Sequence, residues 1–218
     1  QTNCWVLPGA RYGAFEVKPG GDVFVCSHRA ARNMSFQDIF AEFGKLTILV
    51  DNVPGSELIG IPLNAPLSEY ERVYMLPLLS IKMNKGTGIV TSVPSDSPDD
   101  YGELFFFFGK PNKQQYYGLK PEWIEPFDLL PIIEIPGLGT CAAKTMCEKL
   151  GVQGPGDAER LAEAHDVVYT QGFYKGVMVT GKFVGKPVQE AKVLCKALLV
   201  SQGLAMTYLE PDKEVISR

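Results

Sequence analysis

The sequence contains little of what metal centres and disulfide frameworks require. It has only two histidines, His28 and His165, which lie far apart, and five cysteines with no CxxC spacing. An odd number of scattered cysteines disfavours both a zinc site and a disulfide framework. We therefore expect no metal site, and we expect the cysteines to be reduced thiols of an intracellular protein.

Long apolar runs and a surplus of basic residues are also missing. No run approaches the roughly 18 apolar residues that cross a bilayer, and the N-terminus lacks the basic-then-apolar pattern of a secretion signal. We expect no membrane association. The formal net charge is −4, so a nucleic-acid partner would be contacted at a local site rather than along a basic stripe. The 218 residues suit one globular domain.

Strand-like segments dominate the first half of the chain and alternate with helix-like segments in the second. The predicted strands are residues 2–6, 13–17, 23–26, 46–50, 58–60, 73–81, 131–137 and 205–209. The predicted helices are residues 28–34 and 140–150, a helix capped by Asp157, and a helix that starts at Pro187 and ends before Gly203. This pattern predicts a mixed α/β domain with a strand-rich core.

The run from Phe105 to Phe108 is unusual, because four consecutive phenylalanines cannot all point inward on a helix or a strand. Part of this patch is therefore either exposed or covered by a partner. The polar segment that follows reads as a surface loop. We interpret residues 101–127 as a possible insertion or variable surface segment.

The stretch KGTGIVTSVPSDSPDDYG, residues 85–102, combines glycines, hydroxyl side chains, prolines and acidic residues that could form a binding site. Gly86 and Gly88, on either side of Thr87, would let a ligand or another backbone approach closely. The next segment, Thr91 to Val93, ends a strand with exposed backbone and hydroxyl groups that could bind a sugar or a base edge. Pro94 and Pro98 stiffen the turn after it.

Asp96, Asp99 and Asp100 crowd into five positions of this turn. Asp99 and Asp100 would lie in the first turn of a helix capped by Ser95 or Ser97, where the helix dipole stabilises acids by about 0.3–1 kcal/mol. That account explains the acids without any ligand. Alternatively, one acid faces a bound cation, for which a substrate ammonium group is a natural partner, or the acids hold Mg²⁺.

The motif GTGIVTSVPSDSPDD at 86–100 resembles the signature of the editing domain of leucyl-tRNA synthetases of the eukaryotic cytosolic and archaeal type. Other segments agree with this resemblance. They are QTNCWVLPG at 1–9, AARNMS at 30–35, LIGIPLNAPLS at 58–68, IEIPGLG at 133–139, DAERLAEAHDVVYTQGFYKGVMV at 157–179, KPVQEAK at 186–192 and YLEPDKEVISR at 208–218. The resemblance spans essentially the whole chain. It implies the fold of the editing domains of class I valyl, isoleucyl and leucyl enzymes, with a barrel-like core and surrounding helices.

The resemblance also implies an activity, the hydrolysis of the ester of misacylated tRNA(Leu) that carries norvaline, isoleucine or a similar residue. A hydrophobic pocket cannot strongly reject a similar aliphatic side chain, which is why a second site is needed. Asp100 matches the aspartate that anchors the substrate α-amino group. Thr91, Ser92 and Val93 match the strand end that receives the terminal adenosine, and Gly86 to Gly88 match the family's GTG motif.

No cofactor, metal or protein nucleophile is implied, because water attacks a carbonyl that the site holds in position. The expected partners are the tRNA(Leu) 3′ end with its misacylated adenosine and the rest of a cytoplasmic parent synthetase. Lys175 lies in a glycine-bounded loop that could border the pocket.

The sequence departs from the family's pattern in two ways that bear on whether the family's function applies to it. In the family, a threonine-rich segment that lines the amino-acid pocket precedes the QTNCW stretch, whereas the sequence starts at Gln1. We therefore expect residues 1–218 to form a single editing domain that is truncated at its N-terminus. The alternative is a non-catalytic module that binds the tRNA 3′ end or an adenosine-like ligand. The second departure is Phe105 to Phe108, where the family leads us to expect a more charged helix.

Overall fold

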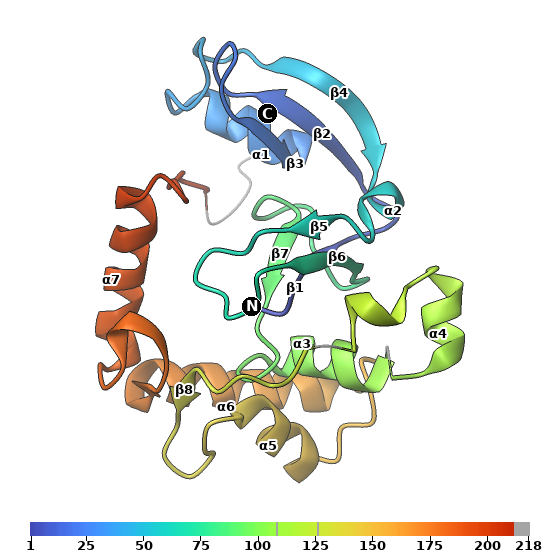
Figure 1. Ribbon diagram of the computed structural model, residues 1–218, viewed down its shortest axis with the longest axis vertical. Helices are drawn as coiled ribbons and strands as arrows, with labels where there is room; N and C mark the ends of the chain where they lie inside the picture. Colours follow the sequence, from blue (N-terminus) through green and yellow to red (C-terminus); the bar gives the residue numbers. More distant parts are fainter. Residues whose placement is uncertain (108, 126, 212–218) are drawn as a thin grey trace, which may run out of the picture. The chain divides into compact units, whose positions relative to one another are not determined.

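The computed structural model describes residues 1–107, 109–125 and 127–211 (Figure 1). The chain divides into two compact units. Unit 1 comprises residues 1–4, 60–74 and 91–205, and unit 2 comprises residues 5–59, 75–90 and the segment from 206 onward. No helix among the described residues is long and apolar enough to cross a membrane.

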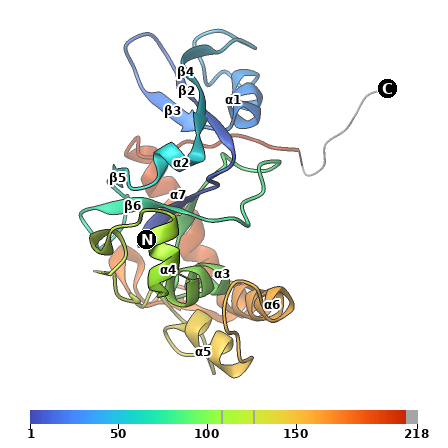
Figure 2. The same cartoon turned by 90° about the vertical axis from the view of Figure 1, so that its right-hand side faces the viewer.

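Unit 2 is built on an antiparallel sheet with the strand order β3-β2-β4. The hairpin predicted from the sequence is confirmed as β2 (Arg11–Glu16) and β3 (Val23–Cys26), and β4 (Thr47–Pro54) is longer than predicted. Helix α1 (His28–Ser35) covers one face of this sheet (Figure 2).

The core of unit 2 lies between α1 and the sheet. It consists of Phe15, Cys26, Ala30, Ala31, Met34, Ile39 and Phe40. The side chain of Ser27 starts α1 by accepting a hydrogen bond from the Ala30 N–H at 3.2 Å, because the first N–H groups of a helix have no partner within it.

A second sheet has the strand order β5-β6-β1-β7. Its strands are β5 (Pro62–Leu63), β6 (Val73–Pro77), β1 (Asn3–Val6) and β7 (Ile89–Ser92). Strands β1, β6 and β7 each run from one unit into the other. Among the described residues no sheet closes on itself, so a barrel-like core is not observed there.

The prediction of a strand at residues 58–60 is wrong. Helix α2 (Gly55–Leu58) occupies its start. Gly60 adopts a φ of +83°, and a Cβ on it would come within 2.3 Å of the Trp123 ring. The chain therefore turns at Gly60 in a backbone conformation that a strand cannot use.

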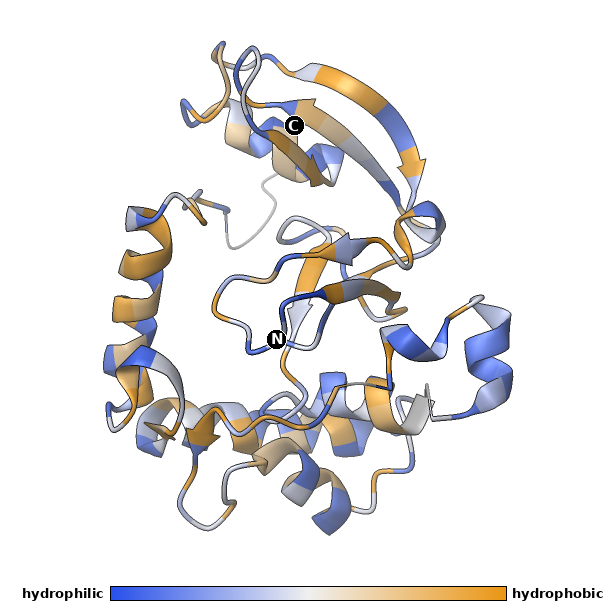
Figure 3. Cartoon of the chain, in the orientation of Figure 1, coloured by the Kyte–Doolittle hydropathy of each residue, from blue (hydrophilic) through white to orange (hydrophobic). Residues whose placement is uncertain are grey.

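The helices of unit 1 follow the acidic turn. They are α3 (Pro98–Tyr101), the π-helix η1 (Gly102–Phe107), α4 (Pro111–Tyr116), the 3₁₀ turn η2 (Pro121–Trp123), α5 (Ala142–Lys149), α6 (Ala158–Lys175), the 3₁₀ turn η3 (Gly181–Phe183) and α7 (Val188–Ser201). Strands β8 (Ile133–Glu134) and β9 (Val177–Met178) pair antiparallel. Helices α5 and α6 lie side by side in both views (Figures 1 and 2). Hydrophobic residues cover most of α7, whereas α4 is largely hydrophilic (Figure 3).

The helices predicted in the second half are confirmed, with small changes at their ends. Helix α5 follows Cys141 rather than a Thr140 cap, and Gly151 adopts the expected positive φ of 64° after it. Leu161 and Val168 are buried on α6, whereas His165, predicted on the same face, is half-buried.

Two expectations on irregular segments have different outcomes. Residues 205–209 do not form the predicted strand, because the Leu209 N–H and C=O bond the side chains of Gln37 and Asn33 instead of a neighbouring strand. Phe105 is 39% exposed, as expected for part of the phenylalanine run. Phe108 lies outside the described residues. So do residues 212–218, which end the YLEPDKEVISR segment that resembles the family.

Candidate functional site

The turn after β7 places its three acids in three different environments. Asp100 is buried at 8% exposure, Asp99 is exposed and Asp96 is half-buried. Ser97 caps α3, since its Oγ accepts a hydrogen bond from the Asp100 N–H at 3.4 Å. The predicted cap and the predicted place of Asp99 and Asp100 in the first turn of α3 are both confirmed.

The Asp100 carboxylate holds the end of strand β7. Its Oδ2 accepts a hydrogen bond from the Val93 N–H at 2.8 Å. Ser92, directly before, is buried, and its carbonyl accepts a hydrogen bond from the Thr2 N–H at 3.2 Å. Asp100 is therefore fixed to the backbone of the strand end, which the helix-dipole account does not predict.

The carboxyl group of Asp96 is perturbed by its surroundings. Burial raises the pKa of its carboxyl to about 6, although a hydrogen bond from Ser95 lowers it. The Ser95 Oγ donates to Oδ2 at 2.7 Å, and Oδ1 is buried without a hydrogen-bond partner among the described residues. The Asp96 charge is thus only partly compensated in the folded chain.

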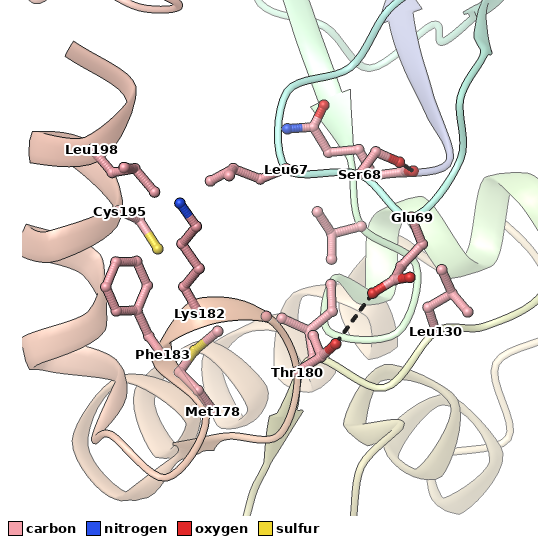
Figure 4. Close-up of a pocket in the computed structure, with 14 residues that line it drawn as sticks. Leu67, Ser68, Glu69, Leu130, Met178, Thr180, Lys182, Phe183, Cys195 and Leu198 are labelled. Carbon is pink, nitrogen blue, oxygen red and sulfur yellow. Dashed lines mark hydrogen bonds between the residues drawn. The ribbon is translucent and has the colours of Figure 1, made fainter. Parts of the chain in front are cut away.

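A cavity of about 420 Å³ opens in unit 1 beside this turn, and its size is within the usual range of small-molecule sites (Figure 4). Its walls are mainly apolar, with a few polar groups. The lining residues are Gln1, Leu67, Ser68, Glu69, Val93, Leu130, Ile132, Met178, Thr180, Gly181, Lys182, Phe183, Cys195 and Leu198.

Val93 connects the cavity with Asp100, because it lines the cavity and its N–H donates to the carboxylate. Glu69 adds an acidic side chain to the wall of the cavity. The Thr180 hydroxyl donates a hydrogen bond to the Glu69 Oε1 at 3.3 Å (Figure 4).

The three residues of the GTG motif lie in unit 2, whereas Asp100 lies in unit 1. Gly88 has a φ of +82°, and a Cβ there would come within 3.0 Å of the Tyr12 ring, whose hydroxyl donates to the Gly88 carbonyl at 2.8 Å. Gly86 donates its N–H to Glu210 at 2.8 Å, and Thr87 bonds the backbone of Ile89. Packing within unit 2 therefore accounts for this motif, and its role in substrate binding stays a prediction.

The predicted substrate residues of unit 1 divide between the cavity and the surface. Val93 lines the cavity. Ser92, which precedes it in the sequence, is buried, and Thr91 is exposed. Lys175 lies in the last turn of α6, exposed, and is not among the lining residues. The lysine that lines the cavity is Lys182, which no sequence motif marked.

Among the described residues, no group of three histidine, cysteine, aspartate or glutamate side chains could hold a metal ion. The chemistry that this arrangement supports is the binding of a cation next to an apolar cavity at the end of a strand. The Asp100 carboxylate would take the cation and the cavity an aliphatic group.

Comparison with known proteins identifies the family. The chain superimposes on GlLeuRS-CP1 with a TM-score of 0.84 and 41% identity, and the match covers 97% of this chain and 79% of that one. The chain belongs to the family of leucyl-tRNA synthetase CP1 editing domains. It also superimposes on the editing domain of the P. falciparum cytosolic enzyme, with a TM-score of 0.87 and 26% identity, covering 75% of that chain.

Curated relatives agree with this assignment of the editing domain. Over all 218 residues this chain is 44% identical to the cytoplasmic leucine–tRNA ligase of Pongo abelii and 46% identical to that of Arabidopsis thaliana. It spans about a fifth of the length of these relatives, 18% and 20%. No family model matches the chain.

Proposed function

We propose that this domain hydrolyses the ester bond of misacylated tRNA(Leu), such as tRNA that carries norvaline or isoleucine. The observation that carries the proposal is Asp100, a buried carboxylate bonded to the Val93 N–H at the edge of an apolar cavity. A carboxylate fixed in this way can bind the α-amino group of an aminoacyl ester with little loss of side-chain freedom.

The cavity supplies the surroundings for the rest of the aminoacyl group. Leu67, Leu130, Ile132 and Met178 line it with apolar surface that suits an aliphatic side chain. The strand end at Thr91, Ser92 and Val93 is our candidate for binding the terminal adenosine.

Catalysis in this proposal depends on position and electrostatics. Water attacks the ester carbonyl, and the chain's residues hold the amine and the acyl group in place, without a cofactor, a metal ion or a protein nucleophile. Gly86, Thr87, Gly88 and Lys175 are further candidates for substrate contact.

We further propose that the domain acts within a larger cytoplasmic leucine–tRNA ligase, whose remaining parts and tRNA(Leu) are its partners. Residues 1–218 would form one editing domain, and residues 101–127 would be a variable segment. A non-catalytic module that binds the tRNA 3′ end or an adenosine-like ligand is the alternative.

The test is deacylation of tRNA(Leu) esterified with norvaline. The chain and a version extended upstream by the threonine-rich segment are compared, each with Asp100→Asn and Asp99→Asn. Asp99→Asn is the matched control, because Asp99 is the exposed neighbour on the same helical turn. We expect Asp100→Asn to slow hydrolysis by about 10- to 100-fold, the effect of one charge-assisted hydrogen bond, and Asp99→Asn to hydrolyse at the unaltered rate.

Equal rates for the Asp100→Asn variant and its parent would refute the anchor. If neither the chain nor its extended version releases norvaline, the binding-module alternative replaces the hydrolase.

A further inference from the structure

Leu67 lines the cavity of unit 1 in a backbone conformation that leucine rarely adopts. Its φ is +59°, in the left-handed region that glycine and asparagine reach far more easily. Strained residues of this kind persist where the surrounding structure fixes them, and they cluster at sites that hold ligands. A leucine at this position therefore requires a physical reason.

Hydrogen bonds hold the turn that carries Leu67. It is the third residue of the turn from Ala65 to Ser68, whose ends are joined by a hydrogen bond from the Ser68 N–H to the Ala65 carbonyl at 3.2 Å. Pro66 in the second position and a positive φ in the third are typical of a type II turn, in which glycine normally takes the third position. The Ser68 hydroxyl also donates to the Gln1 carbonyl at 2.8 Å. The backbone therefore fixes the direction of the Leu67 side chain.

Figure 4 shows Leu67 between two sides of the cavity. Leu198 and Cys195 of α7 lie on one side, and on the other side Glu69 accepts the hydrogen bond from Thr180. The Leu67 side chain points toward Leu198. Because Leu67 is 55% exposed, packing in a hydrophobic core does not account for a leucine there. The side chain instead takes up space between the acidic side and the α7 side of the cavity.

We propose that Leu67 limits the length of the aliphatic side chain that the cavity accepts. The inference rests on the proposed function, in which Asp100 holds the substrate amine and the acyl group lies in the cavity. With the amine on the acidic side, a short unbranched side chain fits in front of Leu67. A longer side chain collides with Leu67 before it reaches Leu198. Excluded volume discriminates well here, because a side chain on a fixed, strained backbone cannot move aside without further strain.

Hydrolysis of two esters that differ only in length tests the limit. The esters of tRNA(Leu) carry norvaline or 2-aminoheptanoate, whose side chain is two methylenes longer, and the protein is the chain or its upstream extension, whichever releases norvaline. Leu67→Ala and Leu67→Gly should each raise the rate for 2-aminoheptanoate relative to norvaline by about 10-fold, the effect of burying two further methylenes.

The matched control for this ratio is Leu204→Ala. Leu204 is 54% exposed, nearly the same as Leu67, and it is not among the residues that line the cavity. We expect Leu204→Ala to keep the wild-type ratio of the two rates. A general loosening of the domain would change the ratio in all three variants, whereas a length limit at Leu67 changes it in two.

A comparison of the two Leu67 variants tests the strain separately. Alanine removes most of the side chain but keeps the Cβ that makes a positive φ unfavourable, whereas glycine removes both. Urea unfolding should therefore show a higher midpoint for Leu67→Gly than for Leu67→Ala. At an unstrained position the order is the opposite, because glycine gives the unfolded chain more conformational freedom.

An unchanged ratio in the Leu67 variants, or an equal change in Leu204→Ala, overturns the length limit. A lower midpoint for Leu67→Gly than for Leu67→Ala also overturns it, because Leu67 would then not be strained. Failure of the proposed function has a different signature, since neither the chain nor its extension would release norvaline, and the length limit would fall with it. Release of norvaline with an unchanged ratio removes the length limit alone.

Discussion

At the scale of single residues, Asp100 combines a structural and a proposed chemical role. The sequence indicated a first-turn acid that contributes little to stability. The structure revises this expectation, because the buried Asp100 carboxylate satisfies the N–H of Val93. Its removal leaves a backbone donor without its partner, which costs more than the loss of a dipole interaction.

The two substitutions of Asp100 should therefore differ in stability. Asp100→Ala is expected to lower the free energy of unfolding by about 1–3 kcal/mol, because the Val93 N–H loses its acceptor. Asp100→Asn retains an acceptor oxygen of the same shape and should lower it much less. Urea unfolding at pH 7 measures both. Equal losses would show that the hydrogen bond to Val93 contributes nothing measurable.

Asp96 should make the stability of the domain depend on pH. Its pKa is raised to about 6 by burial, so the folded state binds a proton more tightly than the unfolded state does. The free energy of unfolding is expected to fall as pH rises from about 4 to about 6. Asp96→Asn should remove this fall and stabilise the domain by about 3 kcal/mol above pH 6.

The check on Asp96 is a series of urea unfolding curves between pH 4 and pH 8. Asp99→Asn serves as the control, since Asp99 is exposed. If Asp96→Asn leaves the pH profile of wild type unchanged, the Asp96 carboxyl is not desolvated in the folded chain.

At the scale of elements, α1, α5, α6 and α7 followed from local signals, whereas several strands did not. Helix α2 was also missed, and α4 occupies the polar segment that was predicted to be a surface loop. Gly151 marks the end of α5 by its positive φ. Asp157 precedes α6 as expected, but its carboxylate accepts a hydrogen bond from the Gln153 N–H instead of capping the helix. A strand also needs a neighbour, which no local pattern supplies. Residues 205–209 have strand-like composition, but Leu209 bonds side chains and so forms no ladder.

The packing of α6 against β8 and α7 depends on a glycine at its end. A Cβ on Gly176 would lie 2.3 Å from the Gly172 carbonyl oxygen and 2.6 Å from the Ile133 side chain. Gly176→Ala is expected to lower the melting temperature, at a cost of about 1–3 kcal/mol for crowding. Gly156→Ala is the control, because a Cβ there meets nothing within 4 Å, and similar melting of both variants would contradict this packing.

At the scale of the whole molecule, the family was predictable and the cavity was not. Motifs spread along the chain identified the family, and the sequence narrowed the cap of α3 to Ser95 or Ser97, of which the structure shows Ser97. The cavity instead combines Gln1, Glu69, Lys182 and Leu198, which lie in separate segments of the sequence. No spacing rule connects such residues, because only the folded chain brings them together.

The distribution of charge over the molecule predicts a preference for single strands. The net charge is −4, and residues 167–201 contain five lysines and one glutamate. Single-stranded RNA is expected to inhibit the release of norvaline more strongly than a blunt RNA duplex at the same nucleotide concentration, because only unpaired bases can stack. Competition assays over a range of salt concentrations measure this difference. Equal inhibition would indicate that charge alone attracts RNA.

In the proposed function, Asp100 recognises the α-amino group of the substrate. The most direct measurement of this role compares two esters of tRNA(Leu), one with norvaline and one with the matching 2-hydroxy acid, which has no amine. Wild type should hydrolyse the amino ester about 10- to 100-fold faster, and Asp100→Asn should hydrolyse both esters at similar rates. If Asp100→Asn retains the full preference for the amino ester, Asp100 is not the amine anchor.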